Sequence, residues 1–93
     1  VKCGFNQLQS LNLSQTEITD NAIEHLTKCD LNQLEIFDVS GIQITDKAIE
    51  FIIKCSFKRL EYLNLNETLI TDKAIEYLIS CGFNKLKSLS LSQ

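Results

Sequence analysis

The chain has 93 residues, of which 44% are hydrophobic and 23% are charged. This length allows one domain or part of one and excludes a multidomain enzyme, and the composition is that of an average globular protein. The formal net charge is −3, from 9 basic and 12 acidic residues, and this balance argues against nucleic-acid binding because phosphate neutralisation needs clustered Lys and Arg. No run of residues approaches the roughly 18 consecutive apolar residues of a membrane span, so no membrane partner is expected.

A repeat of 26 residues runs along the whole chain. It is marked by cysteines that recur at this spacing, namely Cys3, Cys29, Cys55 and Cys81. A fixed period of this size is typical of repeat proteins. The sequence predicts one domain over 1–93, with full repeats at 8–33, 34–59 and 60–85, the end of a repeat at 1–7 and the start of another at 86–93. We expect the chain to be an internal fragment whose array of repeats continues beyond both ends in the full-length protein. Repeats without a polar cap predict association or marginal stability.

Each repeat divides into two halves with different periods. Leu11 and Leu13 alternate with polar residues, which predicts a short strand with one buried face. Ala22, Ile23 and Leu26 then follow helical spacing, with a cysteine three residues later on the same face. The alternation recurs at Phe37 and Val39, at Leu63 and Leu65 and at Leu89 and Leu91; the helical spacing recurs at Ala48, Ile49 and Ile52 and at Ala74, Ile75 and Leu78. The predicted fold is α/β, with parallel strands joined by helical crossovers.

The strand half of the repeat carries a family pattern. Leu8-x-x-Leu11-x-Leu13-x-x-Thr16-x-Ile18 resembles the leucine-rich repeat, although the ninth position is usually Asn or Cys. The Ile-Thr-Asp-x-Ala-Ile-x-x-Leu segment near a cysteine resembles the cysteine-containing subclass, best known from the substrate-binding parts of F-box proteins in ubiquitin ligases. The resemblance implies a solenoid with a curved parallel sheet on the concave side and one short helix per repeat on the convex side.

A Thr-Asp pair stands between the strand half and the helix half of each repeat, at Thr19-Asp20, Thr45-Asp46 and Thr71-Asp72. Such pairs could suggest metal binding. The better interpretation is a helix N-cap, because Thr or Asp there accepts hydrogen bonds from free helical N–H groups and an acid favours the helix dipole. No metal and no cofactor are expected.

The cysteines lack the short spacing of zinc and redox sites. Helices pack about 8–10 Å apart, whereas a disulfide needs Cα atoms within about 7 Å, so we expect free, buried thiols at the helix ends. Free thiols fit a reducing compartment, which predicts an intracellular, cytoplasmic location. Asn12 and Asn66 head glycosylation sequons, which matter only if the protein is secreted.

Other repeated positions have structural interpretations. Two residues after each cysteine stands an apolar residue that we expect in the core, at Phe5, Leu31, Phe57 and Phe83. Glu24/Lys28 and Glu50/Lys54 are spaced for ion pairs on the solvated face of the helices. His25 is the single histidine, and the sequence suggests no nucleophile–base arrangement around it.

The polar strand positions are expected to align in rows on the concave face. The rows are Gln9, Glu35, Glu61 and Lys87; Ser10, Ile36, Tyr62 and Ser88; Asn12, Asp38, Asn64 and Ser90; and Ser14, Ser40, Asn66 and Ser92. Tyr62 and Ile36 are the large residues among them, and exposed aromatics beside apolar residues often anchor protein interfaces. The alternative is that they only cover their neighbours. The candidate protein-binding residues are Ile36, Asp38, Glu61, Tyr62, Asn64, Asn66 and Glu67.

The expected function is that of a non-catalytic protein-interaction module, with a protein partner and no small-molecule substrate. The resemblance implies a more specific function, as the substrate-recognition part of a ubiquitin-ligase adaptor. Two alternatives stay open: a purely structural segment of a large assembly, and an enzyme whose catalytic part lies outside this chain. Observing whether a neighbouring protein covers the concave or the convex face would distinguish the structural segment from the interaction module.

Overall fold

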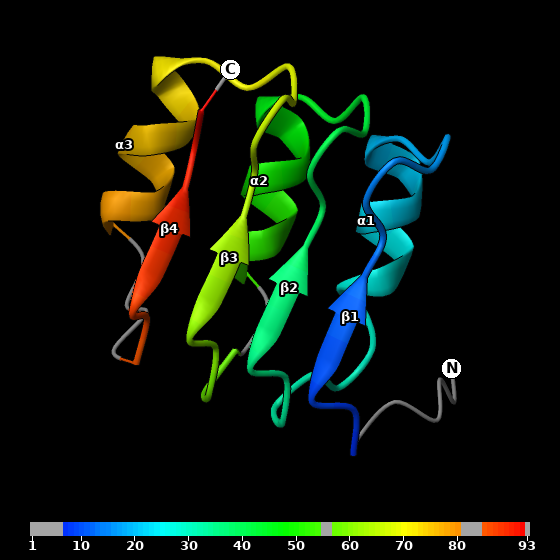
Figure 1. Cartoon of the computed structure of the whole chain (residues 1–93), viewed down its shortest axis with the longest axis vertical. Helices are drawn as coiled ribbons and strands as arrows, with labels where there is room; N and C mark the ends of the chain where they lie inside the picture. The colour runs from blue at the N-terminus through cyan, green and yellow to red at the C-terminus, as the bar shows by residue number, and fades with distance from the viewer. Residues whose placement is uncertain (1–6, 55–56, 81–84, 93) are drawn as a thin grey trace.

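The computed structural model describes residues 7–54, 57–80 and 85–92. Strands and helices alternate along them, as the two periods of the repeat predict (Figure 1). The elements are β1 (Ser10–Asn12), α1 (Asp20–Leu26), β2 (Ile36–Asp38), α2 (Asp46–Lys54), β3 (Tyr62–Asn64), α3 (Asp72–Ser80) and β4 (Ser88–Ser90). The chain is therefore an α/β protein.

The strands form one parallel sheet in the order β1-β2-β3-β4. Each strand pairs with the next at an offset of one repeat, so that Leu11 lies opposite Phe37, Phe37 opposite Leu63, and Leu63 opposite Leu89. The helices lie side by side along one face of this sheet (Figure 1). Parallel pairing requires each connection to cross back to the start of the next strand, and one helix per repeat supplies that crossover.

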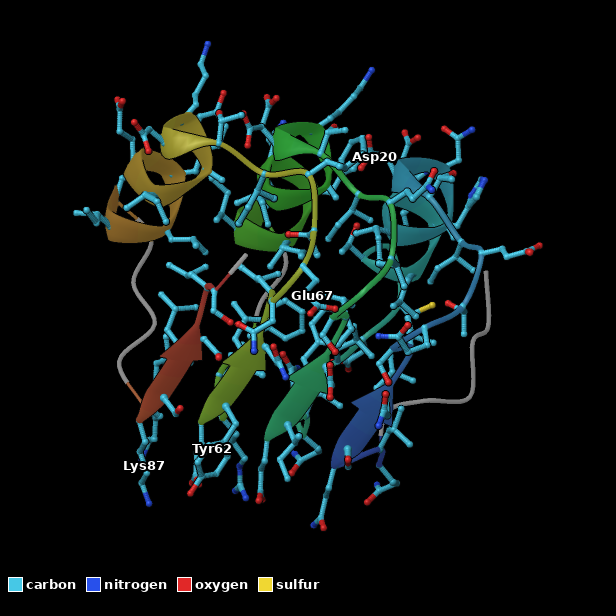
Figure 2. The ribbon with its side chains drawn as sticks, turned by 45° about the horizontal axis from the view of Figure 1, so that its top comes forward. Asp20, Tyr62, Glu67 and Lys87 are labelled. Carbon is cyan, nitrogen blue, oxygen red and sulfur yellow. The ribbon has the colours of Figure 1, made fainter. Side chains whose placement is uncertain are left out.

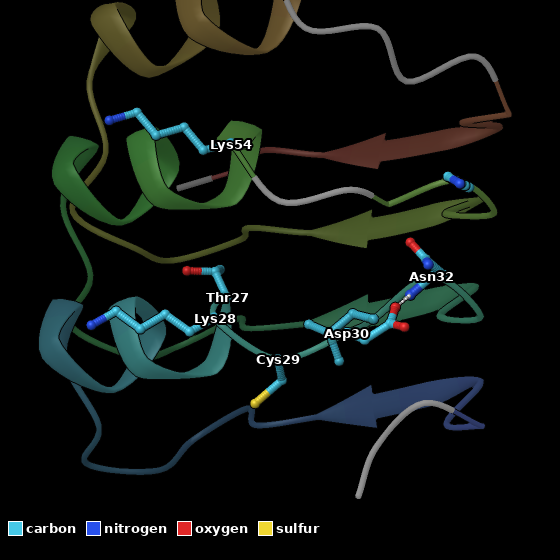
Figure 3. A pocket seen from close by; sticks show the side chains of 8 residues that line it. Thr27, Lys28, Cys29, Asp30, Asn32 and Lys54 are labelled. Atoms are coloured by element: carbon cyan, nitrogen blue, oxygen red, sulfur yellow. Dashed lines mark hydrogen bonds between the residues drawn. The ribbon is translucent and has the colours of Figure 1, made fainter. Parts of the chain in front are cut away.

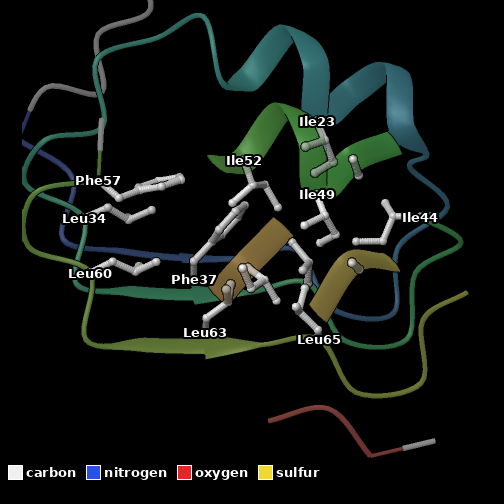
Figure 4. Packing of buried hydrophobic residues seen from close by; sticks show 14 of the residues in the cluster. Ile23, Leu34, Phe37, Ile44, Ile49, Ile52, Phe57, Leu60, Leu63 and Leu65 are labelled. Carbon is white, nitrogen blue, oxygen red and sulfur yellow. The ribbon is translucent and has the colours of Figure 1, made fainter. Parts of the chain in front are cut away.

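The hydrophobic core fills the space between the sheet and the helices (Figure 4). Phe37 and Leu63 point into it from the sheet, and Ile49 and Ile52 enter it from α2. Leu31 and Phe57 are buried as predicted, and the Phe57 ring lies 5.8 Å from that of Phe37 between centroids. The other members of the predicted column, Phe5 and Phe83, lie outside the described residues.

The threonines of the Thr-Asp pairs cap helices in part. Thr45 Oγ1 accepts the backbone N–H of Lys47 at 3.3 Å, and Thr71 Oγ1 accepts that of Lys73 at the same distance. Thr19 makes no side-chain cap bond to α1. The threonine part of the prediction therefore holds at two of the three helices.

The aspartates stand in the first turn of each helix, where an acid favours the helix dipole as predicted. The carboxylates of Asp20 and Asp46, however, bond to the next repeat and not to N–H groups of their own helices. Asp20 is the first residue of α1, and its two carboxylate oxygens accept the backbone N–H and the hydroxyl of Thr45 at 2.9 and 2.7 Å. The carboxylate of Asp46, the first residue of α2, accepts the equivalent hydrogen bonds from the backbone N–H and the hydroxyl of Thr71. Each of these carboxylates joins its helix to the loop before the next helix. We call this pair of bonds the Asp–Thr clasp.

The expectation of free cysteines is also wrong for Cys29, which is disulfide-bonded. α1 ends at Leu26 with Thr27 as its C-cap, so Cys29 lies in the turn beyond the helix. The spacing of packed helix axes therefore does not limit its distance from another cysteine. The other three cysteines, Cys3, Cys55 and Cys81, lie outside the described residues.

The predicted ion pairs along the helices do not form. Among the described residues, an ion pair forms instead beside the sheet, where Lys87 Nζ lies 3.6 Å from Glu61 Oε1. Exposed helical pairs of this kind are weak, and holding two long side chains together costs conformational entropy. Among the helices that the structure describes, none has both the length and the apolar character of a membrane-spanning segment.

Candidate functional surface

The sheet face opposite the helices carries the candidate binding residues. We call it the open face, made up of Ser10, Asn12, Ile36, Asp38, Tyr62, Asn64, Ser88 and Ser90. Strand alternation determines this arrangement: with Phe37 and Leu63 buried against the helices, their neighbours in the strand must point the other way. Tyr62 projects away from the helices at the lower edge of Figure 2.

Ile36 and Tyr62 form a pair on the open face. They are register partners on β2 and β3, and their side chains are 42% and 44% exposed. Together they line a shallow hollow with Asp38, Asn64, Ser88 and Ser90. An apolar and an aromatic side chain thus lie next to each other, surrounded by hydrogen-bonding groups, as at the centre of many protein interfaces.

The polar residues beside this pair are partly occupied by their own loops. Asp38 Oδ1 accepts the backbone N–H and the hydroxyl of Ser40, at 3.0 and 2.7 Å. Asn64 Oδ1 accepts the backbone N–H of Asn66 at 3.0 Å. These bonds hold both side chains in place at the end of their strands. Among the described residues, no hydrogen bond involves Asp38 Oδ2 or Asn64 Nδ2, so both atoms are available to a partner.

The remaining candidate residues are more widely spread. Asn66 Oδ1 accepts the hydroxyl of Ser90 and the backbone N–H of Ser92, both at 2.8 Å, so it helps to join the ends of β3 and β4. Glu67 is exposed in the loop after β3, whereas Glu61 precedes β3 and contacts Lys87. The two glutamates therefore lie beyond opposite ends of one strand, away from each other.

Glu67 also has an unusual backbone conformation. Its φ is +56°, and the equivalent residues of the two earlier repeats, Gln15 and Gly41, have φ of +59° and +71°. At all three positions the backbone N–H donates to the carbonyl of the next repeat, for example from Glu67 to Ser92 at 2.8 Å. The left-handed turn is thus a feature of the repeat that two non-glycine residues tolerate.

A second hollow, which the sequence analysis did not identify, lies at the C-terminal ends of α1 and α2 (Figure 3). Its lining includes Lys28, Lys54 and Lys58 beside Asp30. The 26-residue spacing of Lys28 and Lys54 was the sequence signal for this cluster. All three lysines are exposed, and cations are favourable beside the carbonyl ends of helices, so a structural role is sufficient to explain them.

Within the described ranges, no group of three or more His, Cys, Asp or Glu side chains is placed to hold a metal ion. His25 is exposed in the last turn of α1. No protein-family model matches this chain, and no match was found among curated proteins or among solved structures.

Proposed function

We propose that this chain is a non-catalytic protein-interaction module, a solenoid of the leucine-rich-repeat kind that binds another protein through the open face. One observation carries the proposal: Ile36 and Tyr62 are exposed side by side on a sheet face that none of the described helices covers. Apolar side chains that are exposed next to each other often mark an interaction site, and an aromatic–aliphatic pair is a common anchor of an interface.

The charges around this pair favour a basic partner segment. The chain carries a net charge of −3, and Asp38 stands next to Ile36 on the open face. A partner with an apolar residue flanked by Lys or Arg would place its side chain in the hollow and its charge near Asp38 Oδ2. Complementary charge of this kind mainly speeds association and selects partners.

Site-specific crosslinking tests the proposal. A photoreactive residue placed at position 62 should capture a defined protein, whereas the same residue at Lys54, on α2, should not. With the captured protein purified, Tyr62→Ala should weaken binding about thirtyfold, the equivalent of about 2 kcal/mol. Lys54→Ala is the matched control on the helix side and should leave the dissociation constant unchanged.

The opposite pattern of effects would place the interface on the helices and not on the open face. If Tyr62→Ala binds normally while Lys54→Ala or Glu50→Ala abolishes binding, the helices form the contact surface. The alternative role, a purely structural segment of a large assembly, would be supported by crosslinks from both faces to subunits of one complex. The resemblance to F-box proteins extends the proposal to a specific setting, in which the captured protein is a substrate delivered to a ubiquitin ligase.

The cellular location stays a prediction. The cytoplasmic expectation rested on free thiols, and Cys29 is disulfide-bonded. Disulfides form and persist mainly in oxidising compartments, so this cysteine favours the secretory alternative over the cytoplasm.

A further inference from the structure

Two triplets of the chain have the sequence that accepts N-linked carbohydrate, Asn12-Leu13-Ser14 and Asn66-Glu67-Thr68. The triplet is a sequence requirement alone, and it occurs often by chance. The structure distinguishes the two sites, because Asn12 is exposed at the end of β1, whereas Asn66 is half-buried in the loop after β3.

The side chain of Asn12 is engaged only in its own turn, as far as the described residues show. Its Oδ1 accepts the backbone N–H of Ser14 at 2.9 Å, which closes an Asx turn over the triplet. Among the described residues, no hydrogen bond involves Asn12 Nδ2 or the hydroxyl of Ser14. A sugar bonded to Nδ2 would therefore displace none of these contacts, and the bond that Oδ1 accepts would remain.

The position of Asn12 on the open face is a property of the repeat. Asp38 and Asn64 are its register equivalents on β2 and β3, and each closes the same turn with the residue two positions later. Both of these internal residues lie between neighbouring strands and are still only half-buried. A further strand beside β1 would thus leave the Asn12 side chain accessible from the open face.

Asn66 lies in a more crowded place. Its Oδ1 accepts the hydroxyl of Ser90 and the backbone N–H of Ser92, both at 2.8 Å. The hydroxyl of Thr68, the third residue of its triplet, is buried and donates to the carbonyl of Leu65 at 2.8 Å. A sugar on the Asn66 amide would crowd the junction between the ends of β3 and β4, so the fold disfavours it.

A second observation, on a different part of the molecule, favours the compartment in which such carbohydrate is added. Cys29 is disulfide-bonded, and it lies in the turn after α1 and not on the open face. Disulfides persist mainly in the secretory pathway and outside the cell, and N-linked glycans occupy surface positions of secreted proteins. The disulfide and the Asn12 triplet thus point independently to the same compartment.

We propose that Asn12 carries an N-linked glycan on the open face and that Asn66 does not. In the transfer, Asn12 Nδ2 forms a bond to the anomeric carbon of a lipid-pyrophosphate-linked oligosaccharide. The bond between this carbon and the pyrophosphate oxygen breaks, the pyrophosphate leaves with the electron pair, and Nδ2 gives up one proton. The step needs no oxidant and no reductant.

The glycan would stand beside the proposed binding surface. The hollow at Tyr62 is lined from β2, β3 and β4, so a sugar on β1 flanks this hollow without filling it. The inference goes beyond the proposed function and does not depend on it. It would exclude a cytoplasmic location, and it would leave the open face as a surface for partners outside the cytoplasm.

Mass spectrometry of the full-length protein, purified from the cells that produce it, tests the proposal. Peptide N-glycosidase converts a glycosylated Asn to Asp as it releases the sugar, so residue 12 should be Asp after treatment. Residue 66 should be unmodified Asn before and after treatment. A protein with unmodified Asn12 would overturn the proposal, and a glycan at Asn66 would overturn the argument from crowding.

Variants of the full-length protein, expressed in the same cells, assign the site. Asn12→Gln and Ser14→Ala should each abolish the shift in electrophoretic mobility that the glycosidase removes, and Ser14→Ala does so with Asn12 in place. Ser14→Thr should retain the shift, because Thr also completes the triplet. Asn66→Gln is the matched control and should leave the shift unchanged. A shift that persists in Asn12→Gln and in Ser14→Ala but is lost in Asn66→Gln would place the glycan on the other triplet and contradict the proposal.

Discussion

The carboxylate of Asp46 accepts both the backbone N–H and the hydroxyl of Thr71, which stands 25 residues later in the chain. Thr71 Oγ1 in turn accepts the backbone N–H of Lys73 at the start of α3. The acid at the start of one helix thus orients the threonine that caps the next. This relationship connects the geometry of one repeat to that of its neighbour.

Asp46→Ala should lower the free energy of unfolding by about 1–2 kcal/mol, because it removes both bonds to Thr71. Asp72→Ala is the matched control, since Asp72 has no such partner among the described residues, and it should cost well under that in dilute solution. Urea denaturation of both variants gives the comparison. Equal losses would mean that the aspartates act through their own helix dipoles and that the clasp contributes nothing.

Adjacent residues of β3 should differ sharply in their effect on stability. Leu63 is buried, and truncation to Ala should cost about 2–5 kcal/mol through lost burial and a cavity. Tyr62 is exposed on the open face, so Tyr62→Ala should cost less than about 1 kcal/mol. Thermal or urea unfolding measures both. A large loss in Tyr62→Ala would show that this tyrosine covers the sheet, as the alternative interpretation of the sequence holds.

Gly41→Ala should destabilise the protein by about 1 kcal/mol or more. The φ of Gly41 is +71°, and an added Cβ would lie 2.2 Å from the side-chain amide nitrogen of Gln15, which would have to move. Glu67→Gly, at the equivalent position, should be neutral or stabilising, because glycine relieves the left-handed backbone. Measured free energies of unfolding in the reverse order would contradict this account of the turn.

Thiol counting tests the disulfide of Cys29. Denaturation without reductant should expose at most two reactive thiols, and denaturation with reductant should expose all four cysteines. Reduction of the folded protein should lower its stability by about 2–4 kcal/mol, because the crosslink restricts the unfolded chain. Cys29→Ser provides the control, since its stability should no longer respond to reductant in this way. Four reactive thiols without reductant would exclude the bond.

The sequence by itself determined the elements and the core of this protein. Strand alternation at Phe37 and helical spacing at Ile49 and Ile52 are local periodicities of 2 and 3.6 residues, so they identify the buried side of each element without knowledge of the rest. The same alternation placed Ile36 and Tyr62 on the opposite face. The constant period of 26 residues made them register partners, because a fixed spacing repeats the same offset at each strand pair.

Only the tertiary structure decided the contacts between repeats. Capping rules consider residues within one helical turn, so they assigned Asp20 and Asp46 to their own helices, whereas both bond to a loop 25 residues away. The separation of Glu61 from Glu67 and the bond of Cys29 likewise depend on how loops are placed in space. Loop positions follow from the packing of neighbouring repeats, and no local periodicity encodes the distance between two side chains on different loops.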